Sequence, residues 1–287
     1  MNMKLCLGTA QFGMNYGINN THGKIAEEKI CEILNCAHDN NIFLLDTASA
    51  YGNSEVVLGE TISQIGKNFQ VITKYPANNE NPPPIQLIEK SLNLLKIDKL
   101  YGYLFHNYSI FQKHPEYIDD FVKIKQLGKC EKIGFSLYYP YEAEYILKNN
   151  IPCDIVQIPF NIFDQRFLYL FQDIKNKGID IFVRSVFLQG LFFIDPEKLD
   201  KRFDTIRDLS KELHETAKKH SINVATLCFR FAYKSQNISY AVIGIDSLDN
   251  LKENIQTYKS LSNFNDSSFC FERFAVNDEN IILPFNW

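Results

Sequence analysis

The sequence predicts an α/β fold, a single (β/α)8 barrel of the TIM type that spans residues 1–287. Two observations favour this fold class. Short apolar runs alternate with segments of helical periodicity eight times along the chain, and one such barrel needs about 250 residues. With 45% hydrophobic and 22% charged residues, the chain can build one large core and is globular rather than disordered.

Eight apolar runs are the expected strands. They are short and carry few charges, as in strands of a parallel sheet that is buried on both faces. The expected strands are residues 4–8, 42–47, 69–74, 100–106, 132–136, 154–160, 179–185 and 240–245.

Segments with helical spacing lie between these runs. In the first of them, Ile30, Ile33 and Leu34 share one face, and charged residues occupy another. The prolines of the loop at 78–84 pre-set the first turn of the helix that follows. An extra helical insertion is expected at 195–221, before the seventh barrel helix, and a C-terminal tail follows the eighth. The expected barrel helices are residues 24–40, 54–65, 84–96, 115–127, 141–149, 166–177, 223–234 and 248–260.

The same alternation of strands and helices also fits a doubly wound open sheet. In that fold the first strand usually leads into a G-x-G-x-x-G turn that binds a dinucleotide. No expected strand here is followed by that motif, and no linker divides the chain into two domains. One closed barrel is therefore the favoured interpretation.

Composition excludes several classes of protein. A net charge of −4 with scattered lysines argues against a nucleic-acid or anionic membrane surface, and no apolar run approaches the length of a membrane span. The beginning of the chain has no signal-peptide core. Seven cysteines without a C-x-x-C pair indicate reduced thiols and a cytoplasmic location. The histidines include no H-E-x-x-H, and His214 and His220 do not share a helix face, so no metal site is expected. The sequence does not specify an oligomeric state.

Four polar residues follow three successive strands. Asp46, Lys74 and His106 stand at the carboxyl ends of the second, third and fourth strands, and Tyr51 lies just beyond the second. Each has an ordinary explanation by itself, as a turn residue, a solvated lysine, a core histidine or a packed ring. In a barrel, however, the carboxyl ends of the strands meet at one face, where active sites lie. Their joint occurrence favours a catalytic site.

These residue types suit proton transfer to a carbonyl oxygen. A free tyrosine has a pKa of about 10, and a neighbouring lysine ammonium would lower it. A carboxylate behind the lysine would keep that lysine charged. A histidine on the other side could bind the substrate oxygen as it becomes an alkoxide. The hydride would have to come from a cofactor, because no side chain supplies one.

The segments around these residues resemble the aldo-keto reductases. The resemblance covers almost the whole chain. The tetrad segments are the most specific, and the later motifs occur in the family's order. The matching segments are "LCLGTAQFGMNYG", "DTASAYGNSEVVLGE", "ITK", "LFH", "KIGFS", "VQIPFN", "VRSVFLQGL", "VIGIDSLDNLKEN" and "ENIILPFNW".

The resemblance implies an NAD(P)H-dependent enzyme that acts on a small-molecule carbonyl or alcohol. Tyr51 would be the general acid and Lys74 the partner that tunes its pKa. Asp46 would support Lys74, and His106 would orient the carbonyl.

The resemblance also implies the cofactor contacts. Ser136 and Gln157 match positions that hold the nicotinamide carboxamide, and Arg184 matches a residue stacked near the nicotinamide ring. Two departures are visible: Leu137 stands where many members have asparagine, and Val186 where many have proline. The other expected cofactor-binding residues are Gly8, Thr9, Ser185, Gln189, Gly190, Gly244, Asp246, Ser247, Asn250, Glu253 and Asn254.

The choice between NADP(H) and NAD(H) rests on a further departure from the family. Members that prefer NADP(H) bind the 2′-phosphate with cationic side chains, whereas this chain has Asp246 and Asn250 at the matching positions and Ser247 as a neutral donor. A carboxylate opposes a phosphate but accepts a hydrogen bond from a ribose hydroxyl. The alternative is that Asp246 caps the helix and that Lys252 or another lysine reaches the phosphate. Weak discrimination between the two cofactors, or outright acceptance of NADH, is the favoured interpretation.

The substrate is less specified. Tyr16, Tyr108 and Trp287 are the expected substrate-binding residues, although aromatic rings at such positions also serve as packing. Three further aromatic candidates are Phe12, Phe160 and Phe192. An aromatic mouth fits many aldehydes and ketones, sugars included. Besides a reductase or the reverse alcohol dehydrogenase, the chain could be a cofactor-bound regulatory subunit or a barrel with lyase or hydrolase chemistry. The complete tetrad favours the enzyme.

Overall fold

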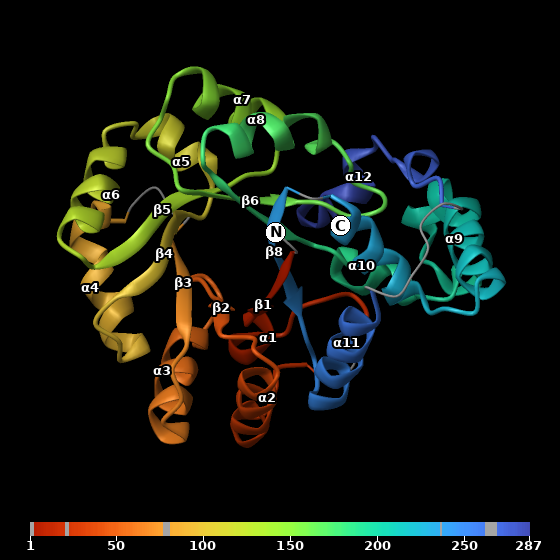
Figure 1. The fold of residues 1–287 in the computed structure, drawn as a ribbon, viewed down its shortest axis with the longest axis horizontal. Coiled ribbons are helices and arrows are strands. Elements are labelled where there is room, and N and C mark those ends of the chain that lie inside the picture. The colour runs from red at the N-terminus through yellow and green to blue at the C-terminus, as the bar shows by residue number, and fades with distance from the viewer. Residues whose placement is uncertain (1–2, 21–22, 77–80, 236, 262–268) are drawn as a thin grey trace.

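The computed structural model describes residues 3–20, 23–76, 81–235, 237–261 and 269–287. Eight parallel strands pair in chain order, and β8 pairs with β1, so the sheet closes on itself (Figure 1). The predicted (β/α)8 barrel is confirmed. Its strands are β1 (Lys4–Gly8), β2 (Leu44–Asp46), β3 (Gln70–Tyr75), β4 (Leu100–Phe105), β5 (Cys130–Ser136), β6 (Ile155–Pro159), β7 (Asp180–Arg184) and β8 (Ile238–Gly244).

Helices surround the strands on the outside (Figure 1). Each buries one apolar stripe against the sheet, and in the first long helix the buried residues include the predicted Ile30, Ile33 and Leu34. No helix in the described ranges is both long and apolar enough to cross a bilayer. Apart from the insertion and the tail, the helices are α1 (Ala10–Gly13), α2 (Glu27–Asp39), α3 (Ser54–Ile65), α4 (Pro84–Leu95), α5 (Tyr108–Lys113), α6 (Tyr117–Gln126), α7 (Pro140–Lys148), α8 (Phe171–Asn176), α10 (Val224–Lys234) and, after β8, α11 (Leu248–Ser260).

The predicted helical insertion lies between β7 and α10. It contains two 3₁₀ helices, Pro196–Lys198 and Lys201–Ile206, and the amphipathic helix α9 (Arg207–Lys219). The C-terminal tail adds a 3₁₀ helix at Glu272–Phe274, the short helix α12 (Glu279–Ile282) and a final 3₁₀ turn at Pro284–Asn286. The predicted insertion and tail are therefore both present.

Several predicted bounds shift. The helix expected at 166–177 is reduced to α8 with a preceding 3₁₀ turn at Leu168–Leu170. In the loop before it, the Asn161 carboxamide oxygen accepts hydrogen bonds from the backbone N–H groups of Phe163 and Asp164, at 2.9 Å each, and the backbone N–H of Arg166 donates to the Asp164 carboxylate at 3.3 Å. Such an asparagine turn competes with helical hydrogen bonding. Of the loop predicted at 78–84, residues 78–80 lie outside the described ranges, and Pro84 begins α4 as expected.

The inside of the barrel is filled by one apolar layer. Leu44, Ile72, Leu104, Ile155 and Phe182 meet there with Cys6 and Val242, and each is at most 8% exposed. A larger core lies between the strands and the helices. The interior layer closes the barrel from below, so a ligand site is left at the carboxyl ends of the strands.

Candidate active site

The candidate site lies directly above the interior layer. Side chains alternate across a strand, so the residue two positions after an inward-pointing one also points inward. Two residues after Leu44, Ile72, Leu104, Ile155 and Phe182 come the site candidates of their strands or strand ends. These are Asp46, Lys74, His106, Gln157 and Arg184, while Gly8 and Gly244 follow Cys6 and Val242 in the same way.

A buried ion pair joins two neighbouring strands. The Lys74 ammonium nitrogen lies 2.9 and 2.8 Å from the two carboxylate oxygens of Asp46 and donates to the backbone oxygen of Thr47 at 2.9 Å. The two side chains are 1% and 3% exposed. Gln157, from the far side of the barrel, donates its side-chain N–H to the same carboxylate at 2.7 Å. All three ammonium protons of Lys74 therefore have an acceptor.

Tyr51 lies between this ion pair and His106. The Lys74 nitrogen is 5.2 Å from the centroid of the Tyr51 ring, and the Tyr51 and His106 rings meet edge to face at 5.7 Å. Burial raises the pKa of Tyr51 well above its ordinary value, Asp46 raises it further, and Arg184 opposes the shift. The expected lowering of this pKa by Lys74 is therefore wrong for this arrangement. Burial and the charge of Asp46 outweigh any stabilisation of the phenolate by Lys74, and the buried phenol keeps its proton.

His106 is held as a neutral ring. Burial, followed by the charges of Lys74 and Arg184, lowers the pKa of His106 to about 3. Its Nδ1 atom is buried and has no hydrogen-bond partner among the residues that the structure describes. A neutral imidazole with an unused nitrogen can form a hydrogen bond with a substrate oxygen without carrying a charge of its own.

The low pKa of His106 predicts an effect of pH on stability. An unfolded histidine has a pKa near 6.5, so between pH 6.5 and about 3 the unfolded chain binds more protons than the folded protein. The free energy of unfolding should therefore fall as the pH is lowered through that window. His106→Gln removes this contribution and should show a shallower loss between pH 7 and pH 5 in urea unfolding. Parallel curves for the two proteins would contradict the assignment.

A cavity opens at this face and runs from the ion pair toward the end of β8. It includes Gln11, whose side-chain oxygen is buried without a partner among the described residues. Many residues expected to bind the cofactor or the substrate line it together with Asp46 and Tyr51. They are Gly8, Thr9, Tyr16, Gln157, Arg184, Ser185, Gln189, Gly190, Gly244, Asp246 and Asn250.

The segment after β7 forms one wall of the cavity. Ser185, Gln189 and Gly190 have backbone φ angles of 60°, 54° and 92°, in the left-handed region. A Cβ atom at Gly190 would come within 2.7 Å of Asn19, so only glycine fits. The Gln189 side chain donates to the Tyr16 hydroxyl at 3.1 Å, and its backbone oxygen accepts from Ile18 at 3.2 Å. The loops after β1 and β7 are thereby joined across the cavity.

The end of β8 places one carboxylate in the cavity. Asp246 lines it, whereas Ser247 is the N-cap of α11 and accepts from the backbone N–H of Asn250 at 3.1 Å. The Ser247 hydroxyl also lies 3.1 Å from an Asp246 carboxylate oxygen. Asp246 is therefore not the helix cap. Lys252 is exposed and lies 3.8 Å from the carboxylate of exposed Asp249.

Other expected site residues do not line the cavity. Tyr108 is buried against Phe111 and Phe135. Trp287 packs on Phe203 and donates to the backbone oxygen of Ile281 at 3.2 Å. Further residues outside the lining are Lys74, His106 and Ser136 below or beside the cavity, and Ser247, Glu253 and Asn254 on or next to α11, where Glu253 is exposed.

Sequence reasoning did not single out Gln11, Asn19, Tyr138 or Phe193. Gln11, Asn19 and Phe193 line the cavity, and the Tyr138 ring lies under the Arg184 guanidinium, 4.3 Å from its carbon. A signal existed for Gln11, which follows β1 within a matched motif, and for Tyr138, which follows Ser136 closely. Nothing in the sequence singled out Asn19 or Phe193.

The cavity fits a nicotinamide dinucleotide. The unpartnered oxygen of buried Gln11 calls for a donor from a ligand, and backbone without side chains borders the cavity at Gly8 and Gly244. A set of three or more potential metal ligands is not found in the described part of the chain. The unpartnered Gln11 oxygen and the polar lining suit an extended polar organic group.

The chain belongs to the Aldo/keto reductase family, whose sequence profile matches residues 4–269. Members of this family are oxidoreductases that use NAD(P)H and act on small-molecule carbonyl compounds.

Similar proteins and solved structures support the same family. The uncharacterized oxidoreductase YqkF of Bacillus subtilis is 25% identical in an alignment 257 residues long that covers 80% of this chain and 82% of that protein. An aryl-alcohol dehydrogenase of Pestalotiopsis microspora is 23% identical in an alignment 288 residues long that covers 88% of this chain and 73% of that one. The holo form of the aldo-keto reductase AKR11C1 from Bacillus halodurans shares the fold, with a TM-score of 0.73 at 19% identity over 94% of this chain and 95% of that one.

Proposed function

We propose that this protein reduces an aldehyde or ketone, sugar-derived compounds included, to an alcohol by hydride transfer from NAD(P)H. The observation that carries the proposal is the position of Tyr51. Its ring lies at the cavity between the buried Asp46–Lys74 pair and His106. This arrangement offers a proton to an oxygen atom in the cavity.

The cofactor, when bound, supplies the hydride. Ser136 and Gln157 are paired in register on β5 and β6 and are the residues that would hold its carboxamide. Gln157 uses its N–H on Asp46, which leaves its side-chain oxygen to accept a hydrogen bond from an amide. Leu137 is fully buried, and its backbone oxygen accepts a hydrogen bond from Arg184. Its apolar side chain cannot make the carboxamide contact that asparagine makes in many members.

Tyr51 would act as the general acid. Because its pKa lies above the ordinary value, the phenol is protonated near neutral pH and can donate to a carbonyl oxygen that is gaining negative charge. Neutral His106 can bind the same oxygen. Lys74, fixed by Asp46, places a positive charge beside the Tyr51 ring and would stabilise the phenolate left after proton transfer.

The test is to mix the protein with NADPH or NADH and a panel of aldehydes and ketones, and to follow reduced cofactor by its absorbance. Turnover that depends on Tyr51 supports the proposal. Tight cofactor binding without turnover on any compound would instead support a regulatory subunit of the same fold. Turnover without a nicotinamide cofactor would contradict both.

We also propose that Asp246 makes the protein accept NADH. Asp246 lines the cavity and is not the helix cap, and Lys252 is engaged with Asp249 on the surface. A carboxylate there accepts a ribose hydroxyl and repels a 2′-phosphate. The hydrogen bond favours NADH and the repulsion disfavours NADPH. The preference for NADPH that is usual where cations bind the 2′-phosphate should therefore be weaker here.

The cofactor proposal predicts a ratio of kcat/KM for NADPH over NADH well below a hundredfold. Asp246→Arg should shift that ratio toward NADPH, by roughly tenfold or more if a charge-assisted hydrogen bond forms with the phosphate. Asp249→Arg is the matched control, because Asp249 is exposed in the first turn of the following helix, α11, and does not line the cavity. A wild-type preference for NADPH of a hundredfold or more would refute the proposal.

A further inference from the structure

One cationic side chain, Arg184, lines the cavity within the described residues. The other charged lining residues are Asp46 and Asp246. Asp46 is already bound by Lys74, and Asp246 lies at the end of β8. Arg184 has no carboxylate within ion-pair distance in the described ranges, so its charge faces the cavity without a counter-ion from the protein.

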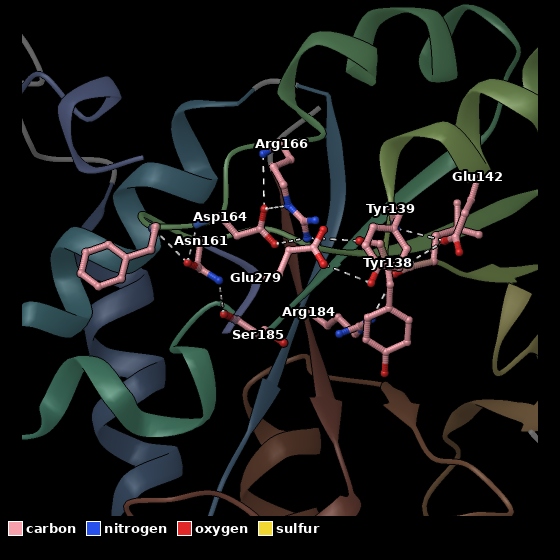
Figure 2. Close-up of polar contacts among 11 residues, drawn as sticks. Tyr138, Tyr139, Glu142, Asn161, Asp164, Arg166, Arg184, Ser185 and Glu279 are labelled. Atoms are coloured by element: carbon pink, nitrogen blue, oxygen red, sulfur yellow. Dashed lines mark hydrogen bonds and ion pairs between the residues drawn. The ribbon is translucent and has the colours of Figure 1, made fainter. Parts of the chain in front are cut away.

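The Arg184 guanidinium is fixed by two contacts. Its Nη2 atom donates to the backbone oxygen of Leu137 at 3.0 Å, and its carbon lies 4.3 Å from the centroid of the Tyr138 ring. In Figure 2 the side chain runs from the end of β7 to that ring. A guanidinium carries five N–H donors, and this arrangement uses one of them. The remaining donors are available to a ligand.

The loop after β6 hydrogen-bonds to two backbone segments next to Arg184, one at Tyr138 and one at Ser185. In that loop Arg166 donates to the backbone oxygen of Tyr138 at 3.1 Å, and Asn161 donates to that of Ser185 at 3.1 Å (Figure 2). Arg166 is itself held at 2.8 and 2.9 Å by the two carboxylate oxygens of Asp164, which is fully buried. A cation held in place in this way loses little conformational freedom when it binds an anion.

Arg184 stands two residues after Phe182 of the interior layer, as Lys74 does after Ile72, and it lines the cavity together with Asp46 and Tyr51. Its charge lowers the pKa of both Tyr51 and His106, although burial and Asp46 outweigh that influence for Tyr51. The fork of an arginine matches a carboxylate or phosphate with two parallel hydrogen bonds. An anion bound here would therefore be part of the molecule whose carbonyl meets Tyr51.

We propose that Arg184 recognises an anionic group on the substrate, so that the preferred substrate is an aldehyde or ketone carrying a carboxylate or phosphate a few bonds from its carbonyl. This inference rests on the proposed carbonyl reduction and names the substrate class of the same site. The anionic group would bind to the N–H edge of the guanidinium. A nicotinamide stacked near the same side chain would contact its face.

The first experiment compares kcat/KM for matched pairs of aldehydes. Succinic semialdehyde and butanal differ in a carboxylate, and glyceraldehyde 3-phosphate and glyceraldehyde differ in a phosphate. The wild-type protein should prefer the anionic member of at least one pair by roughly tenfold or more, as expected for a hydrogen bond to a charged group. The pair that shows the preference identifies the kind of anion. Equal values within both pairs would overturn the inference.

Variants then assign the preference to Arg184. Arg184→Met should bring the ratio of anionic to neutral substrate close to one, and Arg184→Lys should keep part of it because the charge remains. Arg202→Met is the matched control, since Arg202 is an exposed arginine of the insertion beside Asp200. If Arg184→Met lowered kcat/KM equally for both members of a pair and weakened NADPH binding, Arg184 would serve the cofactor and the inference would fail.

A binding measurement separates this inference from the proposed function. Butyrate, butanol and inorganic phosphate are titrated into the protein saturated with NADPH, and the fluorescence of the bound cofactor is followed. Butyrate or phosphate should bind more tightly than butanol in the wild type and lose that advantage in Arg184→Met. Anion binding that depends on Arg184 without reduction of any aldehyde would overturn the proposed function alone. Anion binding unchanged in the variant would overturn the inference alone.

Discussion

Tyr51→Phe should lower kcat by roughly two orders of magnitude or more, the size of a general-acid contribution. The substitution removes the hydroxyl and keeps the ring that meets His106 edge to face at 5.7 Å. The affinity for the cofactor and the free energy of unfolding should therefore change little. Steady-state kinetics with an aldehyde substrate measures kcat, and a fluorescence titration with NADPH measures the affinity for the cofactor.

A matched control for Tyr51→Phe is available on the surface. Tyr169→Phe also removes one phenol hydroxyl, in this case one that donates to Glu144 far along the chain from the tetrad, and Tyr169 is 63% exposed. It should leave kcat unchanged. Near-wild-type turnover in Tyr51→Phe would show that another group donates the proton.

Lys74→Met should damage both activity and stability. Lys74 is 1% exposed and is paired with Asp46, which is 3% exposed, so the substitution leaves a buried carboxylate without its counter-ion. Breaking a buried pair in this way costs roughly 3–5 kcal/mol. The turnover number should fall about as far as in Tyr51→Phe, because the charge that stabilises the phenolate is lost. Urea unfolding followed by circular dichroism gives the stability.

The double variant Asp46→Asn, Lys74→Met separates the two effects. Asparagine removes the unpaired charge and can still accept the hydrogen bond that Gln157 donates to residue 46 at 2.7 Å in the wild type. Much of the lost stability should return, while activity stays low. A double variant as unstable as Lys74→Met would mean that the packing of the lysine stem, and not the charge of Asp46, dominates the loss.

The fold and the floor of the site could be predicted because both follow from short-range periodicity. Apolar runs and helical stripes define the barrel, and the alternation of side chains brings Asp46, Lys74 and His106 to one face above the interior layer. The rule that barrel sites lie at the carboxyl ends of strands then indicates where to look. None of these steps needs knowledge of contacts between distant residues.

The rest of the site depends on the directions of side chains and on contacts between residues that are far apart in the sequence. The hydrogen bond from Gln157 to Asp46 joins residues 111 positions apart. Tyr108 begins the short helix α5 and Trp287 ends the tail, where no long periodic pattern fixes the direction of a ring, and both turn into packing. The direction of the Tyr51 pKa shift was missed because it depends first on how deeply the ring is buried and then on the nearby charge of Asp46.

The position of Trp287 has a consequence for spectroscopy. It is the single tryptophan of the chain, and its ring contacts Phe203 in the insertion. Its emission therefore reports whether the C-terminal tail is docked on the insertion, and gives no direct signal from the chemistry at Tyr51. An unfolding curve followed by intrinsic tryptophan fluorescence would record release of the tail, and a difference between that curve and one followed by circular dichroism would measure how far the tail can detach before the strands separate.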